Sequence, residues 1–170
     1  MTIQTIPKIL TRDFVLVFLA QFVFTSVFHI LIPTLPIYLS RLGSTETEIG
    51  VLIGIFFFSS LFLRPFIGKA LLKTHEKTFM IAGALLFALT SVAYLFAPPF
   101  WPLLIVRIFQ GIGFAFFQTA SLTLIVNISS EAHRGRSLSY FYLAINLSGA
   151  LGPSLGMFLI NRFSFTVLFW

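Results

Sequence analysis

Long apolar runs separated by short polar gaps make up most of this 170-residue sequence. A bilayer core about 30 Å thick needs roughly 20 apolar residues in a helix, and backbone polar groups inside lipid must be bonded within the segment. Strands of an outer-membrane barrel would alternate apolar and polar residues, and these runs do not. The pattern therefore predicts an all-α integral membrane protein in which 1–170 form a single transmembrane domain. The predicted helices are 14–38, 49–71, 79–97, 102–128 and 138–160, with the start of a sixth at 165–170.

Composition supports a lipid environment and excludes most soluble classes of protein. Hydrophobic residues make up 58% of the chain and charged residues 9%, whereas a soluble domain carries roughly 25% charged residues. The formal net charge is +6, but the basic residues lie in the gaps between apolar runs and not on one solvated face or tail. We therefore expect a lipid bilayer, and no nucleic acid, as partner. The absence of cysteine excludes disulfides and thiolate metal sites.

Basic residues are distributed unequally between the two ends of the predicted helices. In membrane proteins, Lys and Arg concentrate in short cytoplasmic loops. We therefore expect the more basic side to be cytoplasmic, which places the N-terminus in the cytoplasm of a multi-pass plasma membrane protein; a compact chain suits a bacterial inner membrane. The basic side holds Lys8, Arg12, Lys69, Lys73, Lys77, Arg134 and Arg136, and the opposite side holds Arg41 and Arg162.

Arg107 is the most informative residue inside a predicted helix, because an ionised side chain in lipid is costly unless it has partners or water. Gln110 lies one turn further on, and Gln118 follows Arg107 by eleven residues on nearly the same helix face. This polar stripe predicts a wet pathway for a substrate or a proton. Arg107 is also only six residues from Trp101, so a side chain that extends to the membrane interface is an equally good interpretation of the residue by itself.

Polar residues also occur in the apolar centres of the first and fifth helices. Gln21, Thr25 and His29 recur at four-residue spacing, so they share one face of the first helix. His29 is a candidate proton carrier, although a neutral histidine bonded to a neighbouring helix is the commoner arrangement. Asn146 in the fifth helix is a candidate substrate contact, and an interhelical hydrogen bond is the favoured alternative.

Glycine spacing predicts where helices approach each other closely. Gly50 and Gly54 lie one turn apart in the second helix, and the fifth helix contains Gly149, Gly152 and Gly156. Glycine lets two helix backbones come close together in a membrane. Pro153 breaks a backbone hydrogen bond, so we expect it to bend the fifth helix.

No enzyme constellation emerges from the sequence. All five acidic residues fall at helix ends or in loops, so they cannot form a buried carboxylate pair for acid and base catalysis. The three histidines lack metal-ligand spacing such as HExxH, and the glycines of QGIGFAFF lack the Lys and Ser or Thr of a nucleotide phosphate loop. We therefore expect no catalysis, no cofactor and no metal site.

Two helical segments resemble motifs of the major facilitator superfamily. RIFQGIGFA is similar to the family's fourth-helix motif, and SGALGPSLGMF is similar to the glycine-proline motif of its exporters. The first resemblance implies that the Arg takes part in proton coupling or in contacts along the translocation path. The second implies a kinked helix that favours exchange over leak, although Ser148 and Met157 stand where that motif usually has glycine. The matching residues are Arg107, Gln110, Gly111 and Gly113 in the first motif, and Gly152, Pro153 and Gly156 in the second.

The segment RPFIGKALLKTHEKT after the second helix resembles the family's cytoplasmic gating loop. Gly68, Lys73 and Lys77 are in register with it. The usual Asp is replaced by Leu72, and Glu76 stands at a position that is usually basic, so the family's charge network cannot form in the same way. An ordinary positive-inside loop is the alternative interpretation of these lysines.

The resemblance implies the N-terminal six-helix half of a twelve-helix fold, in which a substrate site lies at the membrane midplane between two halves. We accordingly predict a secondary active transporter of a small molecule that exports it by alternating access. The proton is the expected coupling ion. The chain is expected to be an incomplete half, which requires a missing C-terminal half or a second copy. The alternatives are a non-transporting membrane scaffold or partner subunit, and an inactive truncated transporter.

Overall fold

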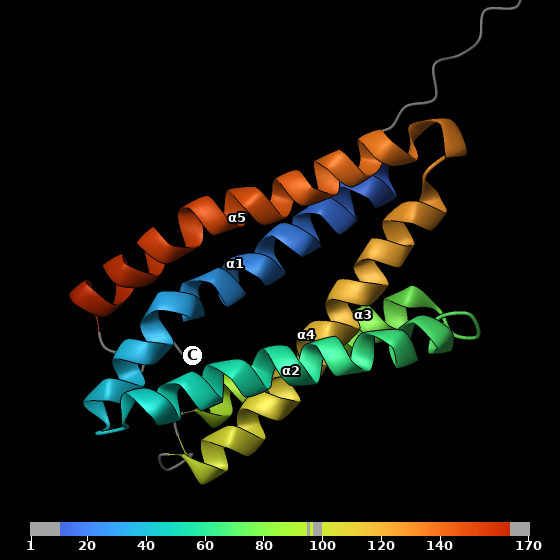
Figure 1. Ribbon diagram of the computed structural model, residues 1–170. Helices are drawn as coiled ribbons and strands as arrows, with labels where there is room; N and C mark the ends of the chain where they lie inside the picture. The colour runs from blue at the N-terminus through green and yellow to red at the C-terminus, as the bar shows by residue number, and fades with distance from the viewer. Residues whose placement is uncertain (1–10, 95, 97–99, 164–170) are drawn as a thin grey trace, which may run out of the picture.

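The computed structural model describes residues 11–94, 96 and 100–163, and every regular element in these residues is helical (Figure 1). The all-α fold class predicted from the apolar runs is confirmed. The predicted start of a sixth helix lies outside the described residues, as does the end of the predicted third helix at 97. The elements are α1 Arg12–Arg41, α2 Glu46–Ala70, α3 Glu76–Ala93, α4 Trp101–Ile128, the short 3-10 helix η1 Glu131–His133, and α5 Arg134–Arg162.

α1 and α2 begin before their apolar runs because polar residues cap their first turns. The Thr11 hydroxyl accepts a hydrogen bond from the Phe14 amide at 3.3 Å, so α1 starts at Arg12. Thr45 and Glu48 form a reciprocal capping box that starts α2 at Glu46. Hydropathy alone does not detect such turns, because they lie at the membrane surface and contain charged residues.

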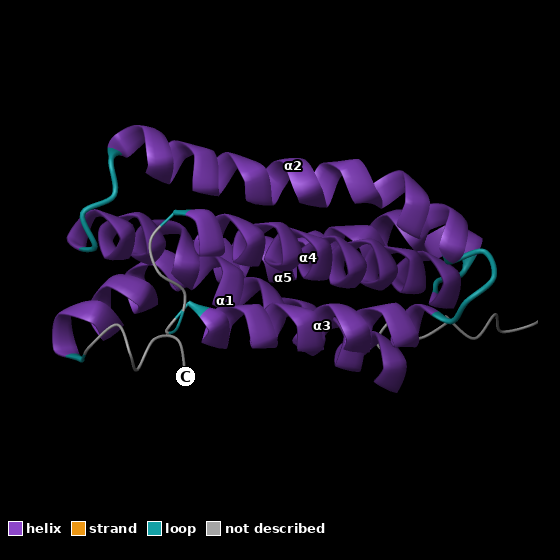
Figure 2. Ribbon diagram, turned by 90° about the horizontal axis from the view of Figure 1, so that it is seen from below, coloured by secondary structure: helices purple, strands orange, loops and turns teal. Residues whose placement is uncertain are grey.

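The described helices pack as two groups. α4 lies against α2 and α3 along much of its length, and α1 lies against α5, whereas α1 and α4 share a smaller contact (Figures 1 and 2). The α3–α4 contact is close because two glycines face each other: a Cβ atom on Gly83 would lie 2.7 Å from the carbonyl oxygen of Gly113. A stripe of small residues therefore sets the separation of these two helices.

The described helices do not pack closely through Gly50 and Gly54, so the expected contact is absent from this part of the fold. A Cβ atom on either glycine would meet no atom of the described residues within 4 Å, and both positions are exposed. The spacing of small residues identified a possible contact face, but α2 turns a different face toward α4. That face contains Phe56 and Ser59, which are buried.

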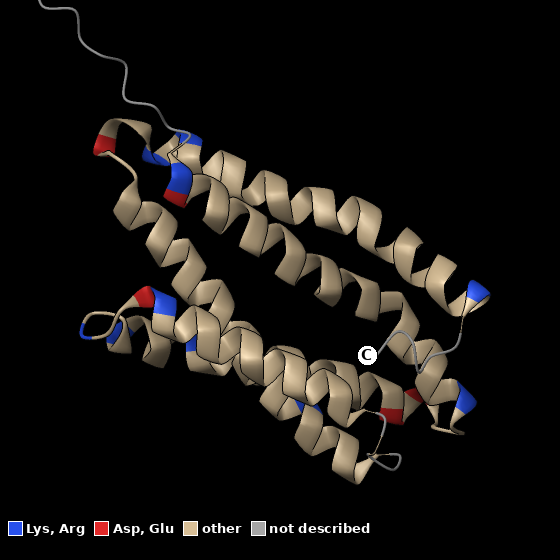
Figure 3. Ribbon diagram, turned by 180° about the vertical axis from the view of Figure 1, so that it is seen from behind, with Lys and Arg blue, Asp and Glu red and all other residues tan. Residues whose placement is uncertain are grey.

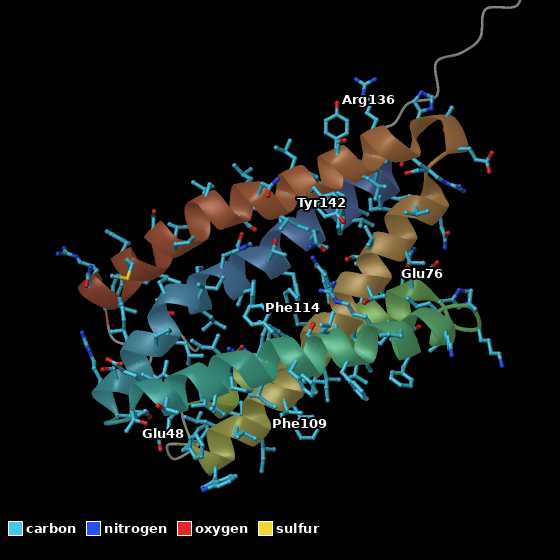
Figure 4. All side chains as sticks on the ribbon, in the orientation of Figure 1. Glu48, Glu76, Phe109, Phe114, Arg136 and Tyr142 are labelled. Atoms are coloured by element: carbon cyan, nitrogen blue, oxygen red, sulfur yellow. The ribbon has the colours of Figure 1, made fainter. Side chains whose placement is uncertain are left out.

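Aromatic side chains fill the region where α1 meets α4. Phe24 of α1 stacks on Phe117 of α4 with 3.9 Å between ring centroids, and Phe28 of α1 lies 4.7 Å from Phe114 by the same measure. Figure 4 shows Phe114 in the space between α1 and α2. Phe56 of α2 joins the cluster at 5.4 Å from Phe114. This aromatic cluster therefore connects the two groups of helices.

The outer surface of the described helices fits a bilayer. All five α-helices are long and apolar enough to cross a membrane, and most Lys, Arg, Asp and Glu residues lie at the two ends of the bundle (Figure 3). Large apolar side chains such as Leu61 and Leu89 point outward and are 67% and 68% exposed. Apolar faces of this size are stable in lipid and unfavourable in water. The chain is therefore a multi-pass membrane protein.

Candidate functional site

Arg107 lies in the middle of a hydrogen-bond network that joins α2, α3 and α4. Its side chain is 6% exposed, and its Nε atom donates to the backbone oxygen of Leu52 on α2 at 2.9 Å. Its Nη1 atom donates to Gln110 Oε1 at 2.9 Å and to the hydroxyl of Tyr94, which directly follows α3, at 3.3 Å. The Tyr94 hydroxyl in turn donates to Gln110. The guanidinium is therefore held between helices and does not extend along the surface.

The charge of Arg107 has no carboxylate beside it in the described residues. All five acidic residues lie at helix ends, and none is bonded to Arg107. The guanidinium carbon instead lies 4.6 Å from the centroid of the Phe56 ring, which is fully buried. An aromatic face and neutral acceptors stabilise a cation, but they leave its charge unneutralised. The site therefore contains a buried positive charge with neutral neighbours.

The polar stripe predicted along α4 is divided by the packing of the bundle. Arg107 and Gln110 form hydrogen bonds with residues of α2 and α3, whereas Gln118 accepts a hydrogen bond from Gln21 of α1 at 2.7 Å. Gln110 also reaches the Ser91 hydroxyl of α3 at 3.4 Å. The three side chains share one helix face, but α4 meets different neighbours along its length. The described residues thus contain two separate networks on this face.

The second network joins α1 to the middle of α4. Gln21 is fully buried, and its Oε1 atom accepts a hydrogen bond from the Ser121 hydroxyl at 2.9 Å. Its amide nitrogen donates to Gln118, which is half-buried. A ligand that took these bonds would have to supply new partners to Gln118 and Ser121, because an unsatisfied buried polar group is costly.

His29 belongs to a third network, between α1 and α5. Its Nδ1 atom lies 2.8 Å from the Thr25 backbone oxygen and 2.9 Å from the Ser148 hydroxyl. Because a carbonyl oxygen only accepts, this contact assigns the proton to Nδ1 and leaves Nε2 as the nitrogen that can take up a second proton. Ser148 also donates to the Thr25 hydroxyl at 2.9 Å. The geometry therefore accommodates both interpretations of His29, as an interhelical bond and as a proton carrier.

Asn146 lies apart from these networks. It is exposed on α5, and no described residue forms a hydrogen bond with it. The interhelical hydrogen bond favoured for Asn146 is therefore absent from the described part of the fold. An exposed amide within an apolar helix is available for a ligand or for a helix outside the described residues.

Comparison with known proteins places these residues in a family. The family model of the Major Facilitator Superfamily matches residues 17–170. The chain belongs to the major facilitator superfamily. Within this superfamily it is similar to the quinolone resistance protein NorA of Staphylococcus aureus, with 29% identity over 146 residues that cover 86% of this chain and 37% of NorA. An uncharacterised MFS-type transporter of Methanocaldococcus jannaschii is 28% identical over 138 residues, which cover 81% of this chain and 36% of that protein.

The chain spans less than two fifths of the length of these two superfamily relatives. The fold agrees with this coverage, since the described residues contain the first five helices expected of an N-terminal half. The predicted superfamily is confirmed by the family model.

The superfamily motif glycines lie at close helix contacts. A Cβ atom on Gly111 would lie 2.5 Å from the Phe56 carbonyl oxygen of α2, and Gly113 faces Gly83 of α3. On α5, a Cβ atom on Gly156 would lie 2.9 Å from the Ile30 carbonyl oxygen of α1. These glycines therefore set the distances between helices. Pro153 lies inside α5 next to Gly152, and the helix continues through it.

The segment that resembles the superfamily gating loop lies at one end of α2 and α3. Gly68 falls in the last turn of α2, Lys73 in the connecting turn and Lys77 in the first turn of α3, and all three are exposed. No described residue forms an ion pair with either lysine. Glu76 instead accepts a hydrogen bond from Asn127 at the far end of α4 at 2.6 Å.

Sequence reasoning missed several residues that complete the networks. Tyr94 was not singled out because tyrosine near a helix end is common at a membrane interface, yet it is 1% exposed and bonded to Gln110. Ser148 was noted only as a departure from the glycine motif, and that departure was the signal: a hydroxyl replaces a packing glycine opposite Thr25 and His29. The Leu52 carbonyl had no sequence signal, because every residue has one.

Proposed function

We propose that this chain is the N-terminal half of a secondary active transporter that exports a small molecule in exchange for protons. In this proposal the N-terminus and the α2–α3 turn are cytoplasmic, in a bacterial plasma membrane. A second half of the same fold, from a C-terminal segment or a second copy, completes the central cavity. The substrate pathway follows Arg107, Gln110, Gln118, Gln21, His29 and Asn146.

The buried charge of Arg107 is the observation that carries this proposal. Burial of an arginine without a carboxylate beside it is costly, and the Arg107 side chain is only 6% exposed. A protein that needed only to hold its helices together would not require this cost. Such a residue is retained where a charge acts on a substrate, an ion or a conformational change. The superfamily membership of the chain supports the same conclusion.

Export and proton coupling rest on further observations. NorA is by its name a quinolone resistance protein, which favours export as the direction of transport. For proton coupling, His29 offers a second protonation position at Nε2, beside the α1–α5 contact. A Cβ atom added at Gly149 would lie 3.4 Å from Nε2, so a proton taken up at Nε2 would place a charge in the contact between α1 and α5. The charge would change how closely these two helices pack.

Alternating access requires groups of helices that move against each other. In this proposal the described helices move together as one half against the second half, with α2, α3 and α4 joined by the Arg107 network and α1 and α5 joined by glycine contacts. The aromatic cluster between α1 and α4 would hold these two groups together as one body. Gly68, Lys73 and Lys77 would limit the motion at the cytoplasmic end.

Substitution of Arg107 tests the proposal. In proteoliposomes that contain the full-length transporter, a proton gradient should drive efflux of the quinolone norfloxacin, a probe chosen because NorA is by its name a quinolone resistance protein. Arg107→Ala should abolish this efflux, while Arg107→Lys retains part of it. Arg162→Ala is the matched control, since it removes the same side chain from an exposed helix end, and it should transport normally. Full activity of Arg107→Ala would refute a role for the charge. If the unsubstituted protein drove no efflux and Arg107→Leu inserted and folded normally, the non-transporting scaffold would be favoured.

A further inference from the structure

A small cavity beside Arg107 has one charged wall. It has a volume of about 110 Å³ and lies between α1, α2 and the Arg107 side chain of α4. Phe28 and Ile32 of α1 and Phe57 of α2 are among its apolar lining residues, and Arg107 is the charged one. A molecule that enters the cavity therefore meets a cation in an otherwise apolar wall.

The hydrogen bonds to described residues leave part of the Arg107 guanidinium unused. Arginine has N–H donors on Nε, Nη1 and Nη2. Nε donates to Leu52, and both bonds from Nη1 go to Tyr94 and Gln110. No described residue accepts a hydrogen bond from Nη2. Three hydrogen bonds thus fix the plane and position of the guanidinium. Nη2 is left for a ligand, and the positive charge stays uncompensated because all three acceptors are neutral.

The geometry points to a binding site for the carboxylate of an aromatic or other apolar acid, held by Arg107 Nη2 with its apolar body against Phe28 and Phe57. A carboxylate supplies the charge that the described residues lack, and a charge-assisted hydrogen bond to arginine is roughly twice as strong as a neutral one. Fixing the guanidinium in advance lowers the entropy cost of binding. This inference rests on the proposed function only in taking the bound acid to be a transported substrate.

The cavity has room for this class of ligand. A protein cavity of about 150 Å³ holds a benzene molecule, so about 110 Å³ holds a carboxylate and part of an adjoining ring. The remainder of a larger acid would extend out of the cavity between α1 and α2. A neutral ligand can accept a hydrogen bond from the guanidinium but leaves its charge without compensation, so it gains less than a carboxylate, and a cationic ligand is repelled.

Binding of two matched probes tests the inference without any mutation. The full-length protein is placed in phosphatidylcholine nanodiscs, and calorimetry measures the affinity of 2-naphthoate and of 2-naphthamide, which have the same ring system and differ in charge. We expect 2-naphthoate to bind at least about tenfold more tightly, as a charge-assisted hydrogen bond in a buried site predicts. Equal affinities, or tighter binding of the amide, would overturn the inference.

Variants then locate the preference. Arg107→Gln should reduce the ratio of the two affinities to about one, Arg107→Lys should preserve part of it, and the exposed control Arg162→Gln should leave it unchanged. A preference that survives in Arg107→Gln would place the carboxylate elsewhere and overturn the inference.

Replacing part of the phosphatidylcholine with phosphatidylglycerol tests the other source of an anion. If phosphatidylglycerol abolished the Arg107-dependent binding of 2-naphthoate, the site would hold a lipid headgroup and the inference would fail.

The same preparation separates this inference from the proposed function. Proton-driven efflux of norfloxacin without any preference for 2-naphthoate over 2-naphthamide would refute the carboxylate site and leave the transporter intact. A clear preference for 2-naphthoate that depends on Arg107, with no proton-driven efflux of any probe, would support the site and refute proton-coupled export.

Discussion

Substitution of Gly152 by alanine tests the contact that holds α1 against α5. A Cβ atom at this position would lie 2.6 Å from the His29 Cβ atom and 3.2 Å from its backbone carbon. These atoms belong to or adjoin the backbone of α1, so no side-chain rotation can relieve the clash. The two helices would have to separate. Gly149→Ala is the matched control, because its Cβ atom would lie 3.4 Å from the His29 ring, an ordinary van der Waals distance.

The expected difference between the two variants follows from these distances. Both exchange glycine for alanine inside α5, so both gain about 1 kcal/mol of helix propensity, which cancels in the comparison. Overpacking against a fixed backbone costs Gly152→Ala about 1–3 kcal/mol. Separation of α1 from α5 also weakens the hydrogen bond between His29 and Ser148, worth about 1 kcal/mol. Gly152→Ala should therefore be about 2–4 kcal/mol less stable than Gly149→Ala.

Thermal unfolding in detergent, followed by the circular dichroism of the helices, measures this difference. For a chain of this length, it corresponds to a melting temperature about 5–15 °C lower for Gly152→Ala than for Gly149→Ala. Gly135→Ala provides a second control near the start of α5, where a Cβ atom would meet nothing within 4 Å. If Gly152→Ala and Gly149→Ala melted at the same temperature, α1 and α5 would not approach each other as described, and the reasoning would be refuted.

Three further substitutions address the networks and the motif proline. Tyr94→Phe keeps the buried ring but removes the hydroxyl that bonds Arg107 Nη1 and Gln110. Transport should fall several-fold while membrane insertion stays normal. Unchanged transport would show that Arg107 does not need the Tyr94 hydroxyl to position it. Ser148→Ala removes the interhelical hydrogen bonds to Thr25 and His29 and should cost about 1 kcal/mol in a thermal melt; an unchanged melting temperature would exclude a contribution of these bonds to stability. Pro153→Ala should insert normally but alter the balance of exchange and leak in vesicles, and unchanged exchange and leak would contradict a coupling role for the proline.

The predicted site divides into residues that a sequence can identify and residues that it cannot. Arg107 and His29 stand out because a charged or titratable side chain inside an apolar run is costly wherever the run packs. Tyr94 and the Leu52 carbonyl escape notice, because their role exists only when α2, α3 and α4 come together around one guanidinium. Gln118 shows the same limit: its spacing from Arg107 was read correctly as one helix face, but its bonding partner Gln21 comes from another helix.

The sequence by itself determined that this protein lies in a membrane and that its described spans are helical. These properties depend on the length and composition of single segments, because lipid cannot satisfy backbone polar groups and each helix must do so alone. Tertiary structure alone decided which glycines serve as contacts. Gly50 and Gly54 have suitable spacing and face outward, whereas Gly83 and Gly113 meet between helices. Helix pairing depends on the fit of two surfaces that are distant in the chain, and the periodicity of one helix contains no information about the surface of the other.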